Sequence, residues 1–316
     1  MQEFLEKLYD ILEESILACK ARTIALSGGL DSSILAYFFR EKKCNAISIS
    51  TEDFIATDLT FCQLVAKKFN LKLEMKIVSI ENLLSAIEET IKILKVFNDI
   101  EIRNSVVMYL TLKSVQENGQ HGIITGDGAD ELFAGYSFFL KKNDVEIQKD
   151  LERIWKIMHF SSKKIGQALG ITVETPFLDK NVVDFAKNIP VNLKVKEKDG
   201  KKYGKWILRK AFEDKLPQTI VWRDKSPMQD GAGTTGLTHL FNTLISDDVF
   251  NTKFKQIQEL DNVSIQSKES LHYYEIYRKY FEPPFKLHSS NTKCPNCQFE
   301  VKYGSKFCRM CGSFPI

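Results

Sequence analysis

A short glycine-rich segment near the start of the chain has the residue types that bind phosphate. It reads Ser27-Gly28-Gly29-Leu30-Asp31-Ser32-Ser33 and follows an apolar run, so it should join a buried strand to a helix. Glycines let the backbone approach an anion, and hydroxyl and amide groups at a helix start can hold phosphate oxygens. A carboxylate beside a phosphate needs a cation between them, which makes Asp31 a candidate magnesium ligand. The spacing is not that of a Walker loop, and the alternative is an ordinary glycine-rich turn with a Ser/Asp cap.

A second loop carries three acidic residues within five positions. The sequence Thr125-Gly126-Asp127-Gly128-Ala129-Asp130-Glu131 follows another apolar run, at the expected end of a strand. Carboxylates this close together need a cation, or else their pKa values rise. The alternative is a charged helix cap, because Asp130 and Glu131 could complement a helix N-terminus. The glycines and the position at a strand end favour a ligand-binding loop.

Four of the seven cysteines lie near the C-terminus as two C-x2-C pairs, Cys294 with Cys297 and Cys308 with Cys311. This spacing predicts the closed tetrahedral shell that structural zinc prefers. Two short strands are expected beside Tyr303-Gly304, at 298–301 and 305–307, which would make a small zinc ribbon. Iron, a redox role and four unrelated thiols are the alternatives. A closed site has no open coordination position, which argues against catalysis there.

The elements that must position the two loops alternate between strands and helices. We expect strands at 23–26, 45–50, 72–78 and 121–125, and helices at 2–20, 31–42, 59–69, 80–95 and 104–118. This alternation predicts an α/β fold, with a mostly parallel sheet and helices on both faces. Ligands bind beyond the carboxyl ends of such strands, where both loops lie. The pattern from about 140 to 280 is mainly helical.

Composition excludes several classes of protein. The chain has 316 residues, of which 43% are hydrophobic and 27% are charged. Its net charge of +3 argues against a dominant basic arm that binds nucleic acid and against a dominant acidic disordered tail. No charge-free run is long enough to span a membrane, and the N-terminus is unlike a secretory signal. Seven cysteines without such a signal favour a reducing, cytoplasmic setting.

These segments together resemble a known family. The first loop resembles the pyrophosphate loop of the N-type ATP pyrophosphatases (PP-loop superfamily), which split ATP between its α and β phosphates. The second loop is similar to the GDGxDELFxGY form in the synthetase domain of asparagine synthetase. Further segments match that domain in order: Arg103-Asn104-Ser105, Met108-Tyr109-Leu110, Pro176–Asp179, Lys205–Arg209, Leu216-Pro217, Trp222–Lys225 and Asp230–Gly233. The match covers residues 20–240, approximately.

The resemblance implies an ATP-dependent ligase that adenylates a carboxylate, releases AMP and pyrophosphate, and transfers ammonia or an amine to it. It implies magnesium at Asp31 and Asp130. The implied nucleotide contacts are Leu26, Ser27, Gly28, Gly29, Asp31, Ser32, Ser33, Ile49, Thr125 and Gly126. Lys225 would stabilise charge on the α-phosphate, Asp127 would deprotonate ammonia, and Arg103 would lie near nucleotide and substrate.

The chain departs from the family at two places. It begins at Met1 with the phosphate loop starting at residue 27, which leaves no room for the glutaminase domain that precedes the synthetase in the glutamine-dependent enzymes. We therefore expect free ammonia, a separate glutaminase subunit or an amine on the acceptor as the nitrogen source. Glu174 stands where the family usually has arginine, which puts aspartate in doubt as the acceptor.

The expected domain organisation is a synthetase-like domain at 1–282, a linker at 283–293 and the zinc ribbon at 294–316. An alternative function is modification of tRNA or a protein, with the ribbon and the basic stretch 194–225 holding the macromolecule. That stretch has eleven Lys or Arg against five Asp or Glu. A module that binds ATP without catalysis is disfavoured, because it would not need the acids and Lys225 together.

Overall fold

The computed structural model describes residues 1–287, 292–302 and 304–316, so the predicted linker 283–293 lies partly outside the described residues. The chain divides into two compact units. The first unit contains residues 1–50, 57–76 and 111–227, and the second contains 51–56, 77–110 and 228–316. The predicted domain boundaries after 282 and before 294 stay predictions.

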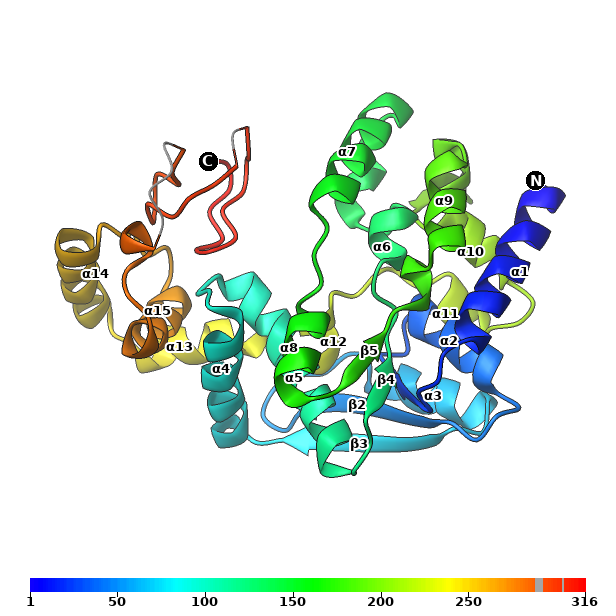
Figure 1. Ribbon diagram of the computed structural model, residues 1–316, viewed down its shortest axis with the longest axis horizontal. Coiled ribbons are helices and arrows are strands. Elements are labelled where there is room, and N and C mark those ends of the chain that lie inside the picture. The colour runs from blue at the N-terminus through cyan, green and yellow to red at the C-terminus, as the bar shows by residue number, and fades with distance from the viewer. Residues whose placement is uncertain (288–291, 303) are drawn as a thin grey trace. The chain divides into compact units, whose positions relative to one another are not determined.

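The first unit is built on a five-stranded sheet with the order β3-β2-β1-β4-β5 (Figure 1). Its strands are β1 (Thr23–Ala25), β2 (Asn45–Thr51), β3 (Lys72–Val78), β4 (Gly122–Ile124) and β5 (Thr172–Glu174). Strand β1 pairs in parallel with β2 and with β4, and β4 pairs in parallel with β5. The prediction of an α/β fold with a mostly parallel sheet is confirmed. Strand β5 was not predicted.

Helices of the first unit pack against this sheet through apolar faces. Helix α1 (Gln2–Leu17) buries Leu8, Leu12 and Ile16, which recur at the spacing of one helix face. Helix α2 (Leu30–Phe39) is buried on most sides, as expected for a helix that follows the central strand. The other helices of this unit are α3 (Leu59–Lys68), α6 (Ala129–Leu132), α7 (Asp144–Ile157), α8 (Ser161–Leu169), α9 (Lys180–Asn188), α10 (Trp206–Ala211) and α11 (Gln218–Val221).

A two-stranded antiparallel hairpin, β6 (Lys196–Lys198) with β7 (Lys201–Tyr203), precedes α10. The 3-10 turns of the first unit are η1 (Ser137–Lys141), η2 (Pro176–Leu178) and η3 (Val191–Leu193). The hairpin and β5 show that the second half of the chain is less uniformly helical than its pattern indicated.

The second unit is helical. It contains α4 (Ile80–Leu94), α12 (Met228–Ala232), α13 (Gly236–Leu244), α14 (Asp247–Asp261), α15 (Lys268–Tyr280) and η4 (Pro284–Lys286), while α5 (Asp99–Glu117) continues from this unit into the first. Ser79 caps α4, and Ser267 caps α15 in a capping box. Phe97 packs its ring against Tyr274 and Tyr277 of α15, which ties the residues before α5 to the core of this unit.

The C-terminal segment after η4 has little regular structure. In its described parts, the only β-type pairing is an isolated antiparallel bridge between Lys293 and Glu300, so the two predicted strands are not formed there. Tyr303, between those predicted strands, lies outside the described residues. Among the described helices, none has the length and apolar character needed to cross a membrane.

Candidate active site

The phosphate loop leaves the carboxyl end of β1 and runs directly into α2. Ser27 and Ser32 place their hydroxyls 3.2 Å apart, and the amide of Gly29 donates to Ser27 Oγ at 3.3 Å. Gly28 has φ +65, and a Cβ there would lie 2.6 Å from the backbone of Phe61 and Cys62. Glycine is therefore required at 28 for both conformation and space. The loop is a tight turn that keeps several donors close together.

The acidic loop leaves the carboxyl end of the neighbouring strand β4. The amide of Thr125 donates to Glu174 O at 3.0 Å, which extends the pairing of β4 with β5 into the loop. A Cβ at Gly126 would lie 2.9 Å from Cβ of Asp31, so the two predicted loops touch at these positions. The parallel arrangement of β1 and β4 thus brings both acid-bearing loops to one edge of the sheet.

Asp31 and Asp130 converge on one lysine. Lys205 Nζ lies 2.6 Å from Asp31 Oδ2 and 2.7 Å from Asp130 Oδ1. Its side chain is only 5% exposed. Burial by itself would lower the pKa of Lys205, but Asp130 and Asp31 outweigh it and hold that pKa above its ordinary value. Lys205 therefore remains an ammonium and neutralises part of this acidic pair.

The Lys225 ammonium forms an ion pair with the other carboxylate oxygen of Asp130, Oδ2. Burial would raise the pKa of Asp130, but the charges of Lys205 and Lys225 outweigh it and lower that pKa below its ordinary value. Gly135 makes room for this cluster, because a Cβ there would lie 1.9 Å from Asp130 Oδ1. The result is an alternating set of charges rather than a bare carboxylate cluster.

Two arginines, the buried Arg209 and the partly buried Arg223, hold the segment that carries Lys225. Arg209 donates from Nε to Gly204 O at 2.8 Å and from Nη1 to the backbone oxygens of Val221 and Arg223. Arg223 pairs with Asp58 at 2.7 Å and donates to Gly28 O at 3.3 Å. The Lys225 segment is therefore tied both to the Lys205 segment and to the phosphate loop.

Most of these groups, though not Asp130, line one hollow of the first unit. Its lining includes Ser27, Gly29, Leu30, Asp31, Asp58, Gly135, Lys205, Arg209, Ile220, Arg223, Asp224, Lys225 and Ser226. Hydroxyl groups, two lysines, two arginines and the glycine backbone make this wall suited to a polyphosphate. Predicted site residues Asp31 and Lys225 thus lie together with part of the phosphate loop.

The two carboxylates also fit the predicted magnesium. Their oxygens converge within hydrogen-bond distance of the same Lys205 ammonium, and magnesium in proteins takes carboxylate oxygens together with substrate phosphates. Asp31 Oδ1 is buried, and the structure shows no hydrogen-bond partner for it among the described residues. An acceptor oxygen of this kind is available to a cation, so the magnesium role of Asp31 and Asp130 stands as a prediction that the residues fit.

Asp127 lies outside the residues that line the hollow. Ser162 on α8 donates a hydrogen bond to Asp127 Oδ2. Burial raises the pKa of Asp127, and this effect exceeds the opposing hydrogen bond from Ser162. A buried carboxyl with a raised pKa is suited to accepting a proton, which is the role predicted for it.

The remaining predicted nucleotide contacts lie at or near the carboxyl ends of β1, β2 and β4 and in the first turn of α2. Leu26, Ile49 and Thr125 are buried, and the Leu26 amide donates to Ile47 O at 2.9 Å, next to the paired residues of β1 and β2. Ser33 is fully buried in the first turn of α2. These positions shape the end of the sheet, and their adenosine contacts stay a prediction.

Arg103 belongs to the second unit, where three side chains hold it. Its Nη1 pairs with Glu269 at 3.0 Å and also donates to Thr238 Oγ1, and its Nε donates to Gln229 Oε1 at 2.9 Å. Glu269 is 1% exposed, and burial raises its pKa despite the arginine beside it. Arg103 is thus the centre of a buried polar network that joins α5, α12, α13 and α15.

The four C-terminal cysteines gather at one point. All four are buried, and their sulfur atoms lie within 4.8 Å of one another. The Sγ atoms of Cys294 and Cys311 are 3.7 Å apart, and those of Cys297 and Cys308 are 3.6 Å apart. Four thiolates around zinc at about 2.3 Å would stand about 3.8 Å from one another, so the cluster fits a tetrahedral ion.

Several site residues carry no role in the sequence interpretation. Lys205 and Arg209 belong to a matched segment, yet the sequence did not indicate that Lys205 reaches both acids, 174 residues away from Asp31 in the chain. Asp58 and Arg223 form their pair across 165 positions. The sequence offered one signal for Lys205 and Arg209, namely their place in a segment that matches the family. Only the fold shows which residues they contact.

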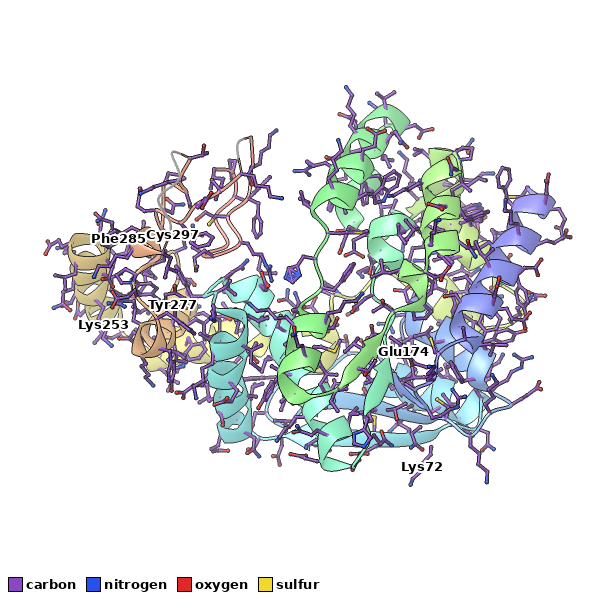
Figure 2. The ribbon with its side chains drawn as sticks, viewed as in Figure 1. Lys72, Glu174, Lys253, Tyr277, Phe285 and Cys297 are labelled. Carbon is purple, nitrogen blue, oxygen red and sulfur yellow. The ribbon has the colours of Figure 1, made fainter. Side chains whose placement is uncertain are left out.

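Glu174 has a structural role that the sequence did not predict. Its two carboxylate oxygens accept hydrogen bonds from the backbone amides of Lys20 and Ala21, at 3.0 and 2.7 Å. Figure 2 labels Glu174 at the end of β5. Glu174 therefore holds the backbone just before β1 through these two hydrogen bonds. Its presence alone gives no reason to exclude aspartate as a substrate.

Comparison with known proteins places this chain in a family. A family model described as asparagine synthase matches residues 3–161 and 144–293. Among curated relatives, asparagine synthetase [glutamine-hydrolyzing] 2 of Oryza sativa subsp. japonica is 29% identical over 82% of this chain and 47% of its own length. A probable asparagine synthetase [glutamine-hydrolyzing] of Dictyostelium discoideum is 31% identical over 82% of this chain and 51% of its own. The chain spans about half the length of these relatives.

Solved structures give weaker likenesses. An NMN synthetase from Francisella tularensis is 12% identical with a TM-score of 0.39, over 88% of this chain and 93% of its own. An NH3-dependent NAD synthetase from Campylobacter jejuni is 17% identical with a TM-score of 0.30, over 68% of this chain and 96% of its own. Likenesses at these TM-scores support no conclusion about the chemistry of this chain.

Proposed function

Because the chain belongs to the asparagine synthase family, we propose that it is an ATP-dependent carbon–nitrogen ligase. In the proposed reaction a carboxylate attacks the α-phosphate of ATP, pyrophosphate leaves, and an acyl-adenylate forms. Ammonia or an amine then attacks the acyl carbon, the amide forms, and AMP leaves. Aspartate is the first acceptor to test, because the relatives are asparagine synthetases and Glu174 is engaged with backbone amides.

The arrangement of charge beside the phosphate loop carries this proposal. Asp31 and Asp130 meet at Lys205, and Lys225 pairs with the second oxygen of Asp130. Phosphoryl chemistry needs fixed positive charge where negative charge develops, held in place before the reaction. Both lysines line the hollow, but Lys205 is only 5% exposed and pairs with two acids, whereas Lys225 is 29% exposed and pairs with Asp130. Lys225 is thus the ammonium better placed to transfer from Asp130 to a phosphate oxygen.

Asp31 and Asp130 would hold magnesium on the pyrophosphate, and the ion would supply Lewis-acid polarisation of the phosphate oxygens when bound. The loop amides and the hydroxyls of Ser27 and Ser32 would orient the departing pyrophosphate. Arg209 and Arg223 keep the Lys225 segment and the phosphate loop in register through backbone oxygens. Substrate positioning of this kind lowers the entropic part of the barrier.

Asp127 would take the proton from ammonia as the carbon–nitrogen bond forms. Its raised pKa brings it closer to the pKa of a useful base than an exposed aspartate would be. Arg103 is proposed to act near nucleotide and substrate, and the four cysteines are proposed to hold structural zinc. Free ammonia, or ammonia from a separate glutaminase subunit, is the proposed nitrogen source.

The test is the release of AMP and pyrophosphate by the purified full chain with Mg-ATP and ammonium. Aspartate is present in one series and absent in the other, and any amide product is identified by mass spectrometry. The proposal predicts AMP and pyrophosphate in equal amounts, dependent on a carboxylate. Asparagine in the product would assign aspartate. ADP in place of AMP would refute adenylation, and the absence of any carboxylate-dependent AMP across an amino-acid panel would refute the ligase.

Lys225→Ala is the informative variant, with Lys215→Ala as its matched control. Lys215 lies between α10 and α11 and pairs with the exposed Asp214, so its loss should leave turnover near wild type. Loss of Lys225 should lower AMP formation by about 100-fold or more, the effect typical of removing a charge-stabilising donor. Turnover retained in Lys225→Ala would remove this residue from the mechanism.

A further inference from the structure

The four-cysteine segment contacts the start of helix α5 through a charged side-chain pair. Arg309, which lies between Cys308 and Cys311, donates from Nε to both carboxylate oxygens of Glu101, at 3.0 and 2.9 Å. Its Nη2 also pairs with Oε1 of the same carboxylate. A guanidinium bound to both oxygens of one carboxylate fixes orientation as well as distance.

The backbone of the same segment adds contacts that do not depend on charge. The Phe97 amide donates to Met310 O at 3.0 Å, and Asn98 Nδ2 lies 3.5 Å from Arg309 O. Met310 is 3% exposed. Gly312 has φ +82, and a Cβ there would lie 2.8 Å from Asn98 Oδ1, so glycine is needed for the turn and for this close approach. The residues between and after the second cysteine pair therefore pack against 97–101.

Asn98 connects this packing to the helix itself. Its side-chain Oδ1 accepts from the Glu101 amide at 3.3 Å, and its backbone oxygen accepts from the Ile102 amide at 2.9 Å. Both are hydrogen bonds of the first turn of α5, where backbone donors lack partners within the helix. The cysteine segment thus covers the residues that begin α5.

A second set of contacts anchors the other cysteine pair. The Ser264 amide donates to Asn296 O at 2.6 Å. Ser313 Oγ accepts from Gln266 Nε2 at 2.6 Å and from Asn296 Nδ2 at 2.8 Å. Figure 2 labels Cys297 in this segment and Tyr277 on α15. Within the second unit, the cysteine segment is therefore held at two places, at 97–101 and at 264–266.

We propose that the metal-loaded cysteine segment is an internal clamp that holds the start of α5 and so positions the Arg103 network. Four thiolates on one ion fix the turn that carries Arg309, Met310 and Gly312, and small segments of this kind lose their shape when the metal is removed. Arg103 follows Glu101 by two residues, and its backbone oxygen accepts from Thr234 Oγ1. Order at the start of α5 is therefore transmitted to α12 and α13.

Side chains that could bind RNA or another protein are instead used in contacts within this chain. Arg309 is bound to Glu101 of α5, and the Met310 side chain is buried, so both are engaged within this chain. A segment built to bind RNA or another protein would present its central arginine outward. Only the consequence for catalysis rests on the proposed function, because it depends on a catalytic role for Arg103. The clamp itself does not.

The test compares amide hydrogen exchange in the full chain with and without its metal. Metal content is measured by elemental mass spectrometry, and the clamp predicts one zinc per chain. Removal of zinc by a chelator should speed exchange in peptides covering 97–110, while peptides covering β1 and α2 in the first unit should not change. Unchanged exchange at 97–110 after complete zinc loss would overturn the clamp.

Point variants separate the clamp from general unfolding. Arg309→Glu should retain zinc yet speed exchange at 97–110 by about five-fold, which corresponds to about 1 kcal/mol for this partly exposed ion pair. The swap Glu101→Arg with Arg309→Glu should restore much of the protection, and Lys306→Glu, an exposed residue of the same segment, should match wild type. Failure of the swap to restore protection, or an equal effect of Lys306→Glu, would refute the specific pairing.

The steady-state readout then tests the link to Arg103. Arg309→Glu should alter KM or kcat in the direction of Arg103→Ala but by less, with the charge swap restoring it. Metal-dependent protection at 97–110 in a chain without ligase activity would refute the proposed function and uphold the clamp. Ligase activity without metal-dependent protection at 97–110 would refute the clamp and uphold the proposed function.

Discussion

Replacing Lys205 with methionine tests the charge arrangement of the site most directly. Methionine keeps much of the side-chain length and removes the ammonium, so Asp31 and Asp130 face one another without their shared cation. Lys205 is 5% exposed, and Asp31 and Asp130 are 19% and 15% exposed. Removing one partner of a buried ion pair costs about 3 to 5 kcal/mol. We expect Lys205→Met to destabilise the first unit by this amount at pH 7.

The assay follows unfolding of the first unit alone. The three tryptophans, Trp155, Trp206 and Trp222, all belong to that unit, so their fluorescence reports its unfolding in urea. With a urea slope of about 1 to 3 kcal/mol per molar, the expected loss lowers the midpoint by about 1 M or more. Lys205→Arg keeps the charge and should fall between methionine and wild type. Lys215→Met, at the exposed pair with Asp214, should change stability by less than about 1 kcal/mol.

The difference should also depend on pH in a stated direction. The pKa of Asp130 is lowered in the folded chain, so its ion pairs contribute stability that is present above the unfolded value of about 3.9 and is lost as the pH falls below it. The pKa of Lys205 is raised, so its contribution persists until the pH exceeds about 10.4. The gap between wild type and Lys205→Met should therefore narrow in acid. A midpoint equal to wild type at pH 7, or a gap that is constant down to acid pH, would refute the reasoning.

Two further variants probe the loops. Asp127→Asn should be as stable as wild type or more stable at pH 7, because burial raises the pKa of Asp127 and so disfavours its ionised form. The variant should still form the acyl-adenylate, measured by exchange of pyrophosphate into ATP, but should lose amide formation, measured by product yield. Stability loss together with normal amide yield would contradict the proton-accepting role. Gly135→Ala should lower both nucleotide affinity and stability, because the added Cβ would lie 1.9 Å from Asp130 Oδ1. Gly119→Ala is its control: it has φ +67 and no atom within 4 Å, so it adds backbone strain without a steric clash. Equal effects of the two substitutions would show that crowding at Asp130 is unimportant.

The sheet was predictable because its strands and helices carry distinct patterns. The buried run before Ser27 and the run before Thr125 form β1 and β4. The mostly parallel arrangement then places both loops at one sheet edge without further information. Strand β5 (Thr172–Glu174) escaped prediction because Val173 is its only apolar residue, whereas the equally short β1 and β4 lie within apolar runs.

Partners distant in the sequence were beyond prediction. Nothing local to Lys205 says that its ammonium reaches Asp31, since that contact depends on Gly135 and on a left-handed backbone at Lys205 itself, with φ +55. The expectation for Glu174 had the same weakness. An acid in place of an arginine was interpreted as a change in the pocket, whereas the fold turns that carboxylate to the amides of Lys20 and Ala21.

The pairing of Asp130 has a consequence for how the site takes up its substrate. Each of its two oxygens is bound by a lysine, Lys205 on Oδ1 and Lys225 on Oδ2. A phosphate that enters the hollow must compete with Asp130 for Lys225, because the two anions share one ammonium. Lys205 cannot be the one to move, since it is nearly buried and also holds Asp31. Before ATP binds, the two lysines would together neutralise the acidic pair Asp31 and Asp130. After ATP binds, Lys205 would stay in place, and the Lys225 ammonium would move from Asp130 to the α-phosphate.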